Sequence, residues 1–116
     1  MATTRPVAAV DVRHVREQLG LSRERLARLL DVSAKTIERW EERDTLPSSF
    51  LVRQRLTQLQ EIADLGRIVY SAEAFALFLT SPLAEFDGQT ALQLIARGQT
   101  ERVLAALASD YEGLGY

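Results

Sequence analysis

The sequence contains no cysteine, a single histidine and only three prolines among its 116 residues. Without cysteine the chain can form neither a disulfide framework nor a thiolate metal site. The longest strongly apolar run, residues 74–79, is far shorter than the roughly 20 residues that cross a bilayer. Residues 1–10 carry one arginine and no extended apolar stretch, so no secretory signal is expected. We therefore expect a cytoplasmic protein without a membrane segment.

Positive charge is scarce in the second half of the chain. Residues 1–59 hold eleven Lys and Arg against eight Asp and Glu, a net charge of +3, whereas residues 60–116 hold three against eight, a net charge of −5. A basic half joined to an acidic half favours two tasks, phosphate contact in the first and a protein partner in the second. Chance clustering on solvated faces explains the asymmetry equally well.

Apolar residues recur with the period of a helix almost everywhere, and no run alternates as a strand would. Glycine, proline, serine and aspartate break the chain into about seven helices. The longest helix, over residues 49–70, would span about 30 Å. We predict an all-α fold in which this long helix joins a helix-turn-helix domain at residues 10–60 to a small helical unit at residues 61–116. Such a rigid link would let the two halves share one core.

Two helix starts of the same kind lie eleven residues apart in the first half. Ser22 and Ser33 each suit the N-cap position, and each is flanked by two apolar residues at staple spacing. Only residues 30–32 separate the two helices, a turn too tight for an antiparallel hairpin. The staple pairs are Leu21 with Leu26, and Val32 with Ile37. The pattern predicts a helix-turn-helix.

The second helix of this pair has the composition of a recognition helix. If Ile37 and Trp40 point to the core, Lys35 and Arg39 lie nearly opposite them as an i, i+4 pair. Such long donors reach guanine edges or phosphates in the major groove. Three glutamates within residues 38–42 are expected to reduce the attraction to phosphate. The predicted DNA-contacting residues are Ser22, Arg23, Arg28, Ser33, Lys35, Thr36, Glu38, Arg39 and Arg43.

The run LSRERLARLLDVSAKTIERWEE, residues 21–42, resembles the Xre/Cro-type helix-turn-helix, which runs from a Leu-Ser or Leu-Thr start through Leu-Ala to a Val-Ser…Ile…Trp recognition helix. The sequence departs from the family at Asp31, where glycine is usual in the turn; aspartate tolerates a left-handed conformation better than most residues. The resemblance implies binding to double-stranded operator DNA, by a homodimer because one helix-turn-helix reads one half-site. A helical hairpin that has lost DNA binding is the alternative.

The second half predicts a small acidic helical unit without a catalytic constellation. Thr90 and Gln93 have the spacing of a capping box, and Gly98 suits a left-handed helix end. His14 lies among charged residues and is expected at the surface. No carboxylate has a partner base, nucleophile or metal cluster in the sequence pattern. We therefore expect no enzyme activity, no cofactor and no metal.

The run FLTSPLAEFDGQTALQLIARGQTERVLAALASDYEGL, residues 78–114, resembles the toxin-binding domain of MbcA/ParS/Xre antitoxins. The sequence has Thr90 where that family often has proline, but both residues start helices. The resemblance implies a type II antitoxin that occludes the active site of an NAD-consuming RES-domain toxin and represses its own operon, as a homodimer within a larger toxin–antitoxin complex. The matching positions are Phe78, Pro82, Leu83, Gly88, Leu94, Ile95, Gly98, Val103, Leu107 and Gly113.

The resemblance also implies that the end of the chain enters the toxin. Tyrosine and leucine there are apolar anchors of the kind that dominate interface energies, and the glycines would let the chain bend. Gly113 is expected to end the last helix and leave residues 114–116 as a loose tail, and deletion of residues 110–116 is expected to cost the core little. The predicted toxin-binding residues are Asp110, Tyr111, Glu112, Gly113, Leu114, Gly115 and Tyr116.

Two other functions remain open at this point. The chain could be a stand-alone transcriptional regulator whose second half serves only dimerisation, or an interaction adaptor that no longer binds DNA. A neighbouring toxin gene favours the antitoxin, and its absence favours the regulator. Toxin neutralisation without operator binding favours the adaptor.

Overall fold

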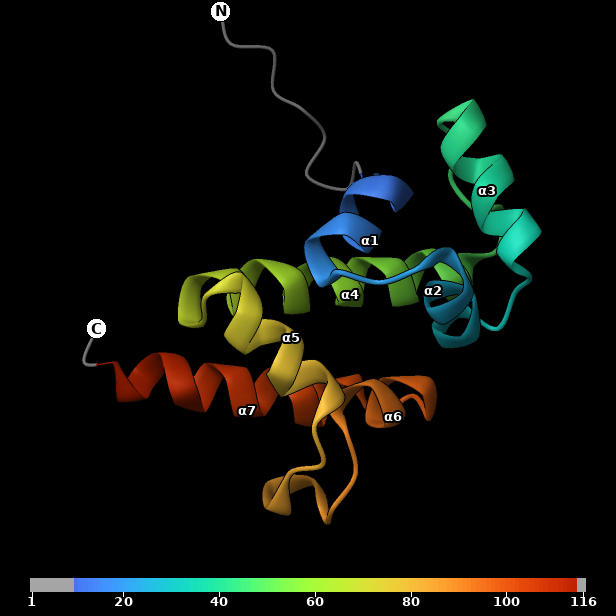
Figure 1. Ribbon diagram of the computed structural model, residues 1–116. Helices are drawn as coiled ribbons and strands as arrows, with labels where there is room; N and C mark the ends of the chain where they lie inside the picture. Colours follow the sequence, from blue (N-terminus) through green and yellow to red (C-terminus); the bar gives the residue numbers. More distant parts are fainter. Residues whose placement is uncertain (1–9, 115–116) are drawn as a thin grey trace, which may run out of the picture.

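The computed structural model describes residues 10–114, and these form an all-helical molecule (Figure 1). Within this range the only extended pairing is an isolated antiparallel bridge between Leu83 and Gln89. The predicted all-α fold with about seven helices is confirmed. In chain order the elements are α1 (Val12–Leu19), α2 (Arg23–Leu30), α3 (Ala34–Arg43), α4 (Phe50–Val69), α5 (Ala72–Thr80), the 3-10 turn η1 (Ala84–Phe86), α6 (Ala91–Ala96) and α7 (Thr100–Gly113).

Local side-chain hydrogen bonds determine where several helices begin. Ser22 and Ser33 each accept the backbone N–H three residues further on, at 3.1 Å, and so satisfy a donor that the helix leaves free. Thr90 and Gln93 form the predicted capping box at the start of α6. At the turn between α2 and α3, Asp31 adopts the left-handed conformation with φ 57°. The predicted caps and the predicted turn are therefore both confirmed.

One hydrophobic core serves both halves of the molecule. The buried side of α4 includes Leu56, Leu59, Ile62 and Ala63, all with no exposed area. This helix contacts α1 and α2 from the first half and α5 and α7 from the second. Figure 1 shows α4 crossing the middle of the molecule, with α7 running along it on one side and α1 on the other. The predicted division between residues 60 and 61 falls inside α4, where the two halves share their core.

Helix α5 approaches α4 closely at Gly66. A Cβ added to Gly66 would lie 2.2 Å from Cε1 of the Phe75 ring, far inside van der Waals contact. Phe75 is only 2% exposed, and its ring stacks on Phe78 with 6.4 Å between centroids. Because interiors are close-packed, that ring has little room to move aside. The absence of a side chain at Gly66 is therefore what lets these two helices touch.

Gly66→Ala is expected to lower the free energy of unfolding by about 1–3 kcal/mol, because the added methyl group must displace a buried ring. This cost exceeds the gain of up to about 1 kcal/mol that alanine brings to a helix. Gly113→Ala is the matched control, since a Cβ there meets nothing within 4 Å. Chemical denaturation followed by circular dichroism measures both. Equal stability of Gly66→Ala and wild type would contradict the close approach of α4 and α5.

Candidate functional site

Helix α3 exposes the side chains predicted to read DNA. Ile37 is fully buried, whereas Lys35 and Arg39 are exposed on the opposite side of the helix, the Lys35 side chain by 85%. Figure 1 shows α3 projecting from one end of the molecule. Arg28 and Arg43 are also exposed. The structure therefore presents a row of cations on and beside a projecting helix, as a recognition helix requires.

The three hydroxyl side chains of the predicted DNA-contacting set lie at helix starts. Ser22 caps α2, and Ser33 caps α3 with its Oγ hydrogen-bonded to Thr36 Oγ1 at 2.9 Å. Both helix N-termini carry partial positive charge, which favours an anion in front of them. The candidate interface therefore contains the N-terminal ends of α2 and α3 as well as the hydroxyl groups of these three residues.

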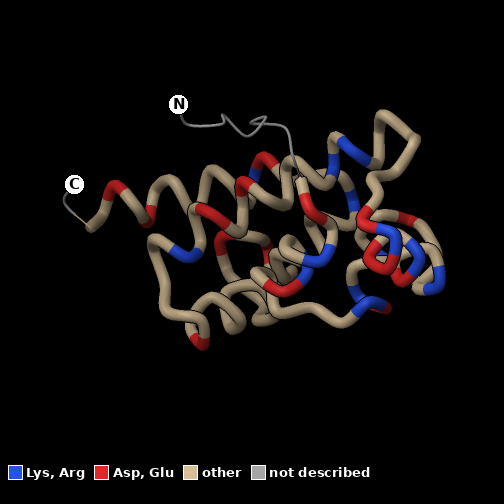
Figure 2. Tube along the Cα trace, turned by 90° about the horizontal axis from the view of Figure 1, so that it is seen from above, with Lys and Arg blue, Asp and Glu red and all other residues tan. Residues whose placement is uncertain are grey.

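Charged residues are distributed unevenly over the molecule. Figure 2 shows Lys and Arg interleaved with Asp and Glu around the end formed by α3, while the end of α7 beside the C-terminus carries acidic residues. The acidic end of α7 is thus separated in space from the mixed charges around α3. The interleaved acids around α3 need an explanation, because they oppose binding to a polyanion.

Glu41 explains part of this pattern and corrects one expectation. Its side chain has no exposed area, so its carboxylate does not lie on the exposed face of α3 that carries Lys35 and Arg39. Arg16 donates from Nε at 2.6 Å and from Nη2 at 3.1 Å, and Arg23 donates from Nε at 3.1 Å. Arg13 lies further off, with Nε 3.6 Å from the carboxylate. Glu41 therefore fastens α3 to α1 and α2 and does not repel phosphate as the sequence suggested.

Arg23 has a structural role that the sequence analysis missed. Its guanidinium lies 3.0 Å from Glu41 and 3.8 Å from Glu38, and its side chain is 37% exposed. Because Arg23 forms an ion pair with Glu41, any contact of Arg23 with a phosphate would have to form beside that ion pair. Glu38 in turn lies 3.7 Å from Lys35, so it partly neutralises the exposed face. Glu41 lies four residues after Ile37, on the side of α3 that was predicted to face the core. This spacing, with arginines upstream, is the signal that could have revealed the network.

Trp40 is half-buried at the edge of the core, so the prediction that it points inward with Ile37 was only partly right. It packs against the core from outside, and the next position, Glu41, is buried instead. On a helix the positions i and i+4 share one face, so Ile37 and Glu41 define the inward side of α3. Trp40, three residues after Ile37, therefore lies at the boundary between this inward side and solvent.

The arginines set the ionisation of Glu41. Burial raises the pKa of this carboxyl, but the hydrogen bonds and charges of Arg16 and Arg23 outweigh burial, and the pKa lies below its ordinary value. The hydrogen bond to Glu41 also raises the pKa of Arg16. Because folding lowers the pKa of Glu41, this interaction stabilises the fold above the unfolded-state pKa. That stability is lost as the pH falls through the folded-state pKa.

Helix α7 ends at Gly113, as the sequence predicted, so Asp110 lies within the helix. Asp110 accepts a hydrogen bond from the Tyr70 hydroxyl. Leu114, just after the helix, is 50% exposed. Gly115 and Tyr116 lie outside the described residues. The predicted toxin-binding residues that belong to α7 are Asp110, Tyr111, Glu112 and Gly113.

The contact between Tyr70 and Asp110 ties the end of α7 to the end of α4. Burial, together with the hydrogen bond to Asp110, raises the pKa of Tyr70 to about 12. Loss of Asp110 would leave a half-buried hydroxyl without this acceptor, at a cost of about 1–3 kcal/mol. The segment from Asp110 is thus part of the fold, contrary to the expectation that it could be removed at little cost. Its helix continues because α7 packs along α4.

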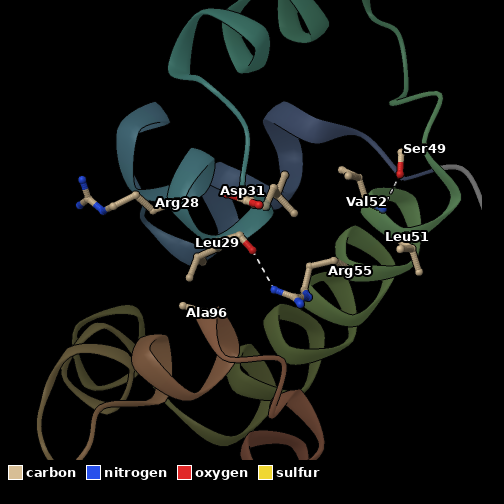
Figure 3. A pocket seen from close by; sticks show the side chains of 9 residues that line it. Arg28, Leu29, Asp31, Ser49, Leu51, Val52, Arg55 and Ala96 are labelled. Atoms are coloured by element: carbon tan, nitrogen blue, oxygen red, sulfur yellow. Dashed lines mark hydrogen bonds between the residues drawn. The ribbon is translucent and has the colours of Figure 1, made fainter.

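A hollow of about 450 Å³ lies at the joint between the two halves. Figure 3 shows Arg55 pointing from α4 toward Leu29, and its Nη1 donates to the Leu29 carbonyl at 2.8 Å. The same atom donates to the Ile95 carbonyl at 3.0 Å. Both carbonyls belong to the last turns of helices, which carry partial negative charge. Arg55 therefore joins α2 of the first half to α6 of the second. The lining residues are Arg28, Leu29, Leu30, Asp31, Ser49, Leu51, Val52, Arg55 and Ala96.

Two other features of residues 10–114 bear on function. None of the helices in this range is both long and apolar enough to span a membrane. No group of three or more His, Asp or Glu side chains in the same range could hold a metal ion. His14 is exposed at the surface, as predicted.

Comparison with known proteins gives matches to the first half and to nearly the whole chain. Residues 12–54 match the family described as Helix-turn-helix. Over 98 residues the chain is 29% identical to the Mycobacterial cidal antitoxin MbcA of Mycobacterium bovis and of Mycobacterium tuberculosis, covering 84% of this chain and 86% of each relative. The fold is similar to a chain in the crystal structure of the M. tuberculosis MbcT–MbcA toxin–antitoxin complex, with a TM-score of 0.77 and 28% identity over 94% of this chain and 97% of that chain.

The chain is therefore similar to an antitoxin over most of its length, and its residues 12–54 match a helix-turn-helix family. The family resemblance inferred from the sequence is thereby confirmed. The likeness in fold extends well past residue 54, so it includes the C-terminal helical unit.

Glu41→Gln is expected to lower the free energy of unfolding by about 2–3 kcal/mol at neutral pH, because two arginines lose their charged partner while the amide oxygen still accepts a hydrogen bond. The difference from wild type should shrink as the pH falls through the folded-state pKa of Glu41, since a protonated carboxyl resembles the amide. Denaturant unfolding at several pH values measures it. The exposed neighbour gives the control, Glu42→Gln, which should stay within about 0.5 kcal/mol. A difference that does not change with pH would contradict this account.

Proposed function

We propose that this protein is the antitoxin of a type II toxin–antitoxin pair, which binds operator DNA through α3 and neutralises a cognate toxin through its C-terminal half. The observation that carries the proposal is the extent of the likeness to MbcA, which covers the C-terminal helices as well as the helix-turn-helix. A regulator that shared only a DNA-binding domain with antitoxins would be similar over residues 12–54 alone.

The proposed DNA interface is centred on the exposed pair Lys35 and Arg39. Their spacing places both side chains on one face of α3, where they can reach base edges or phosphates in the major groove. Arg28 and Arg43 flank this face, and the capped start of α2 offers a second site for phosphate. The buried ion pairs of Glu41 support the proposal, because they keep that acid away from the DNA.

The proposed toxin interface is the end of α7 and the residues that follow it. Tyr111 and Leu114 are exposed by 36% and 50%, and Glu112 lies between them in an acidic half of net charge −5. Aromatic and apolar anchors of this kind dominate many interfaces. We infer that the toxin is of the RES-domain type and consumes NAD. A basic pocket that holds the pyrophosphate of a dinucleotide would attract this acidic surface.

Replacement of Lys35 and Arg39 together by alanine is expected to weaken operator binding at least tenfold, since each good base contact contributes about 1–3 kcal/mol. The thermal midpoint should stay unchanged because both side chains are exposed. A gel-shift titration with DNA from upstream of the gene measures the affinity. The matched control replaces Arg67 and Arg97, exposed arginines outside α2 and α3. Equal loss in both double variants would show general charge attraction and contradict the assignment of α3.

Two truncations of the C-terminal end are expected to separate toxin binding from folding. A chain that ends after Gly113 keeps the hydrogen bond between Tyr70 and Asp110 and should melt like wild type, yet fail to rescue cells that express the toxin. A chain that ends after Ser109 should fail to rescue and also lose about 1–3 kcal/mol of stability. Both should bind operator DNA. Full rescue by the first truncation would show that neutralisation depends on the helical surface before residue 114.

A further inference from the structure

The side of α4 that faces away from the core carries a regular exposed stripe. Its members recur at intervals of four and three along the whole helix, which is the spacing of the a and d positions of a heptad. The stripe lies opposite the buried residues of α4 when each residue turns the helix by about 100°. Both of its ends are apolar and exposed, Phe50 by 68% and Ile68 by 62%. The stripe consists of Phe50, Gln54, Thr57, Glu61, Asp64 and Ile68.

The stripe is also hollowed along its first half. A groove of about 480 Å³ runs beside Phe50 and along the helix to Glu61, with Arg53 on its wall. A helix that only meets solvent does not need large apolar side chains at both ends of one face. The spacing, the groove and the two apolar ends together point to a helix as the occupant.

The charges of α4 identify which helix fits. Arg53 lies near the N-terminal end of the stripe, and Glu61 and Asp64 lie toward its C-terminal end. When the helix is turned end for end about residue 59, Phe50 falls opposite Ile68, and Arg53 falls beside Asp64. Parallel pairing would instead set Glu61 against Glu61 and Asp64 against Asp64. The pattern is therefore complementary to itself in the antiparallel orientation only.

We propose that α4 packs antiparallel against α4 of a second copy of this chain, and that this contact is the dimer interface. The two ends of the pair are apolar contacts of Phe50 with Ile68, and the two ion pairs of Arg53 with Asp64 fix the register. A polar centre makes the dimer weak, because exposed ion pairs contribute little. Such a dimer forms more completely when operator DNA brings two copies together.

The spacing of the DNA-reading helices agrees with this pairing. An α4 of 20 residues is about 30 Å long, so the N-terminal ends of the two α4 helices lie near opposite ends of the pair. Figure 1 shows α3 beyond that end and to the side of α4 away from α7. A twofold axis that passes between the two α4 helices, from the α7 side to the α3 side, leaves both α3 helices on one face. Half-sites one turn apart are separated by about 34 Å. This spacing argument rests on the proposed operator binding, whereas the pairing itself can be measured without DNA.

A charge exchange tests the register. Arg53→Glu and Asp64→Arg are each expected to weaken the dimer of the full chain about tenfold, because each reversal places like charges together at two symmetric positions. The variant that carries both changes should restore the dimer to within about threefold of wild type, as a double-mutant cycle requires. Sedimentation equilibrium measures the dissociation constants. Phe50→Asp should abolish the dimer. Single reversals that leave the dimer unchanged, or a double variant as weak as the singles, would overturn the proposal.

Cross-linking tests the face directly, since the chain contains no cysteine of its own. Thr57→Cys lies near the centre of the stripe and should give a dimer with a short bismaleimide, with or without operator DNA. Ala105→Cys, exposed on α7, is the matched control and should not. Failure of Thr57→Cys to cross-link under both conditions, or cross-linking only to the toxin, would overturn the proposal. A gel shift of wild type with operator DNA is scored separately, so loss of the proposed DNA binding and loss of the dimer are distinguishable.

Discussion

The buried side of α4 is the surface on which both halves of the molecule are assembled. Leu56, Leu59 and Ile62 have no exposed area, and helices from either half pack on them. Burial of one large apolar side chain contributes about 1.5–3 kcal/mol, so neither half can keep its own core if it leaves α4. Arg55 adds a polar link to the same joint through the carbonyls of α2 and α6. A partner that binds at one end of the molecule therefore binds a single packed unit and not an independent domain.

A second constraint orients α3, the proposed DNA-binding helix. Glu41 lies on the inward face of α3, where a carboxylate is costly unless it is paired, and Arg16 and Arg23 pair it from α1 and α2. Hydrogen bonds between charged groups are directional, whereas the contact of Ile37 alone would allow α3 to rotate or slide. The network thus fixes the direction in which Lys35 and Arg39 project. It also keeps one negative charge away from the proposed DNA-binding face.

The proposed functions use separate surfaces of this one core. DNA binding belongs to α3 with its neighbouring arginines, toxin binding to the end of α7, and pairing with a second copy to the outer side of α4. The mixed charges around α3 and the acidic end of α7 lie apart in the molecule (Figure 2), so a partner at one end does not meet the charges of the other. Because the surfaces do not overlap, a dimer on DNA leaves the end of α7 available to a toxin.

The sequence by itself determined every feature that depends on neighbours along the chain. Serine caps, the capping box of Thr90, the left-handed Asp31 and the i, i+4 pair on α3 each need only a few adjacent residues, so the helices and the exposed face of α3 could be predicted. Tertiary structure decided the features that join residues far apart. Glu41 was expected to oppose phosphate because the two arginines that pair with it lie 25 and 18 residues away. Removal of the segment from Asp110 was expected to cost the core little because Tyr70, which bonds Asp110, lies 40 residues earlier. Periodicity says which side of a helix is buried; only packing decides which partner meets it there, because that partner comes from another element.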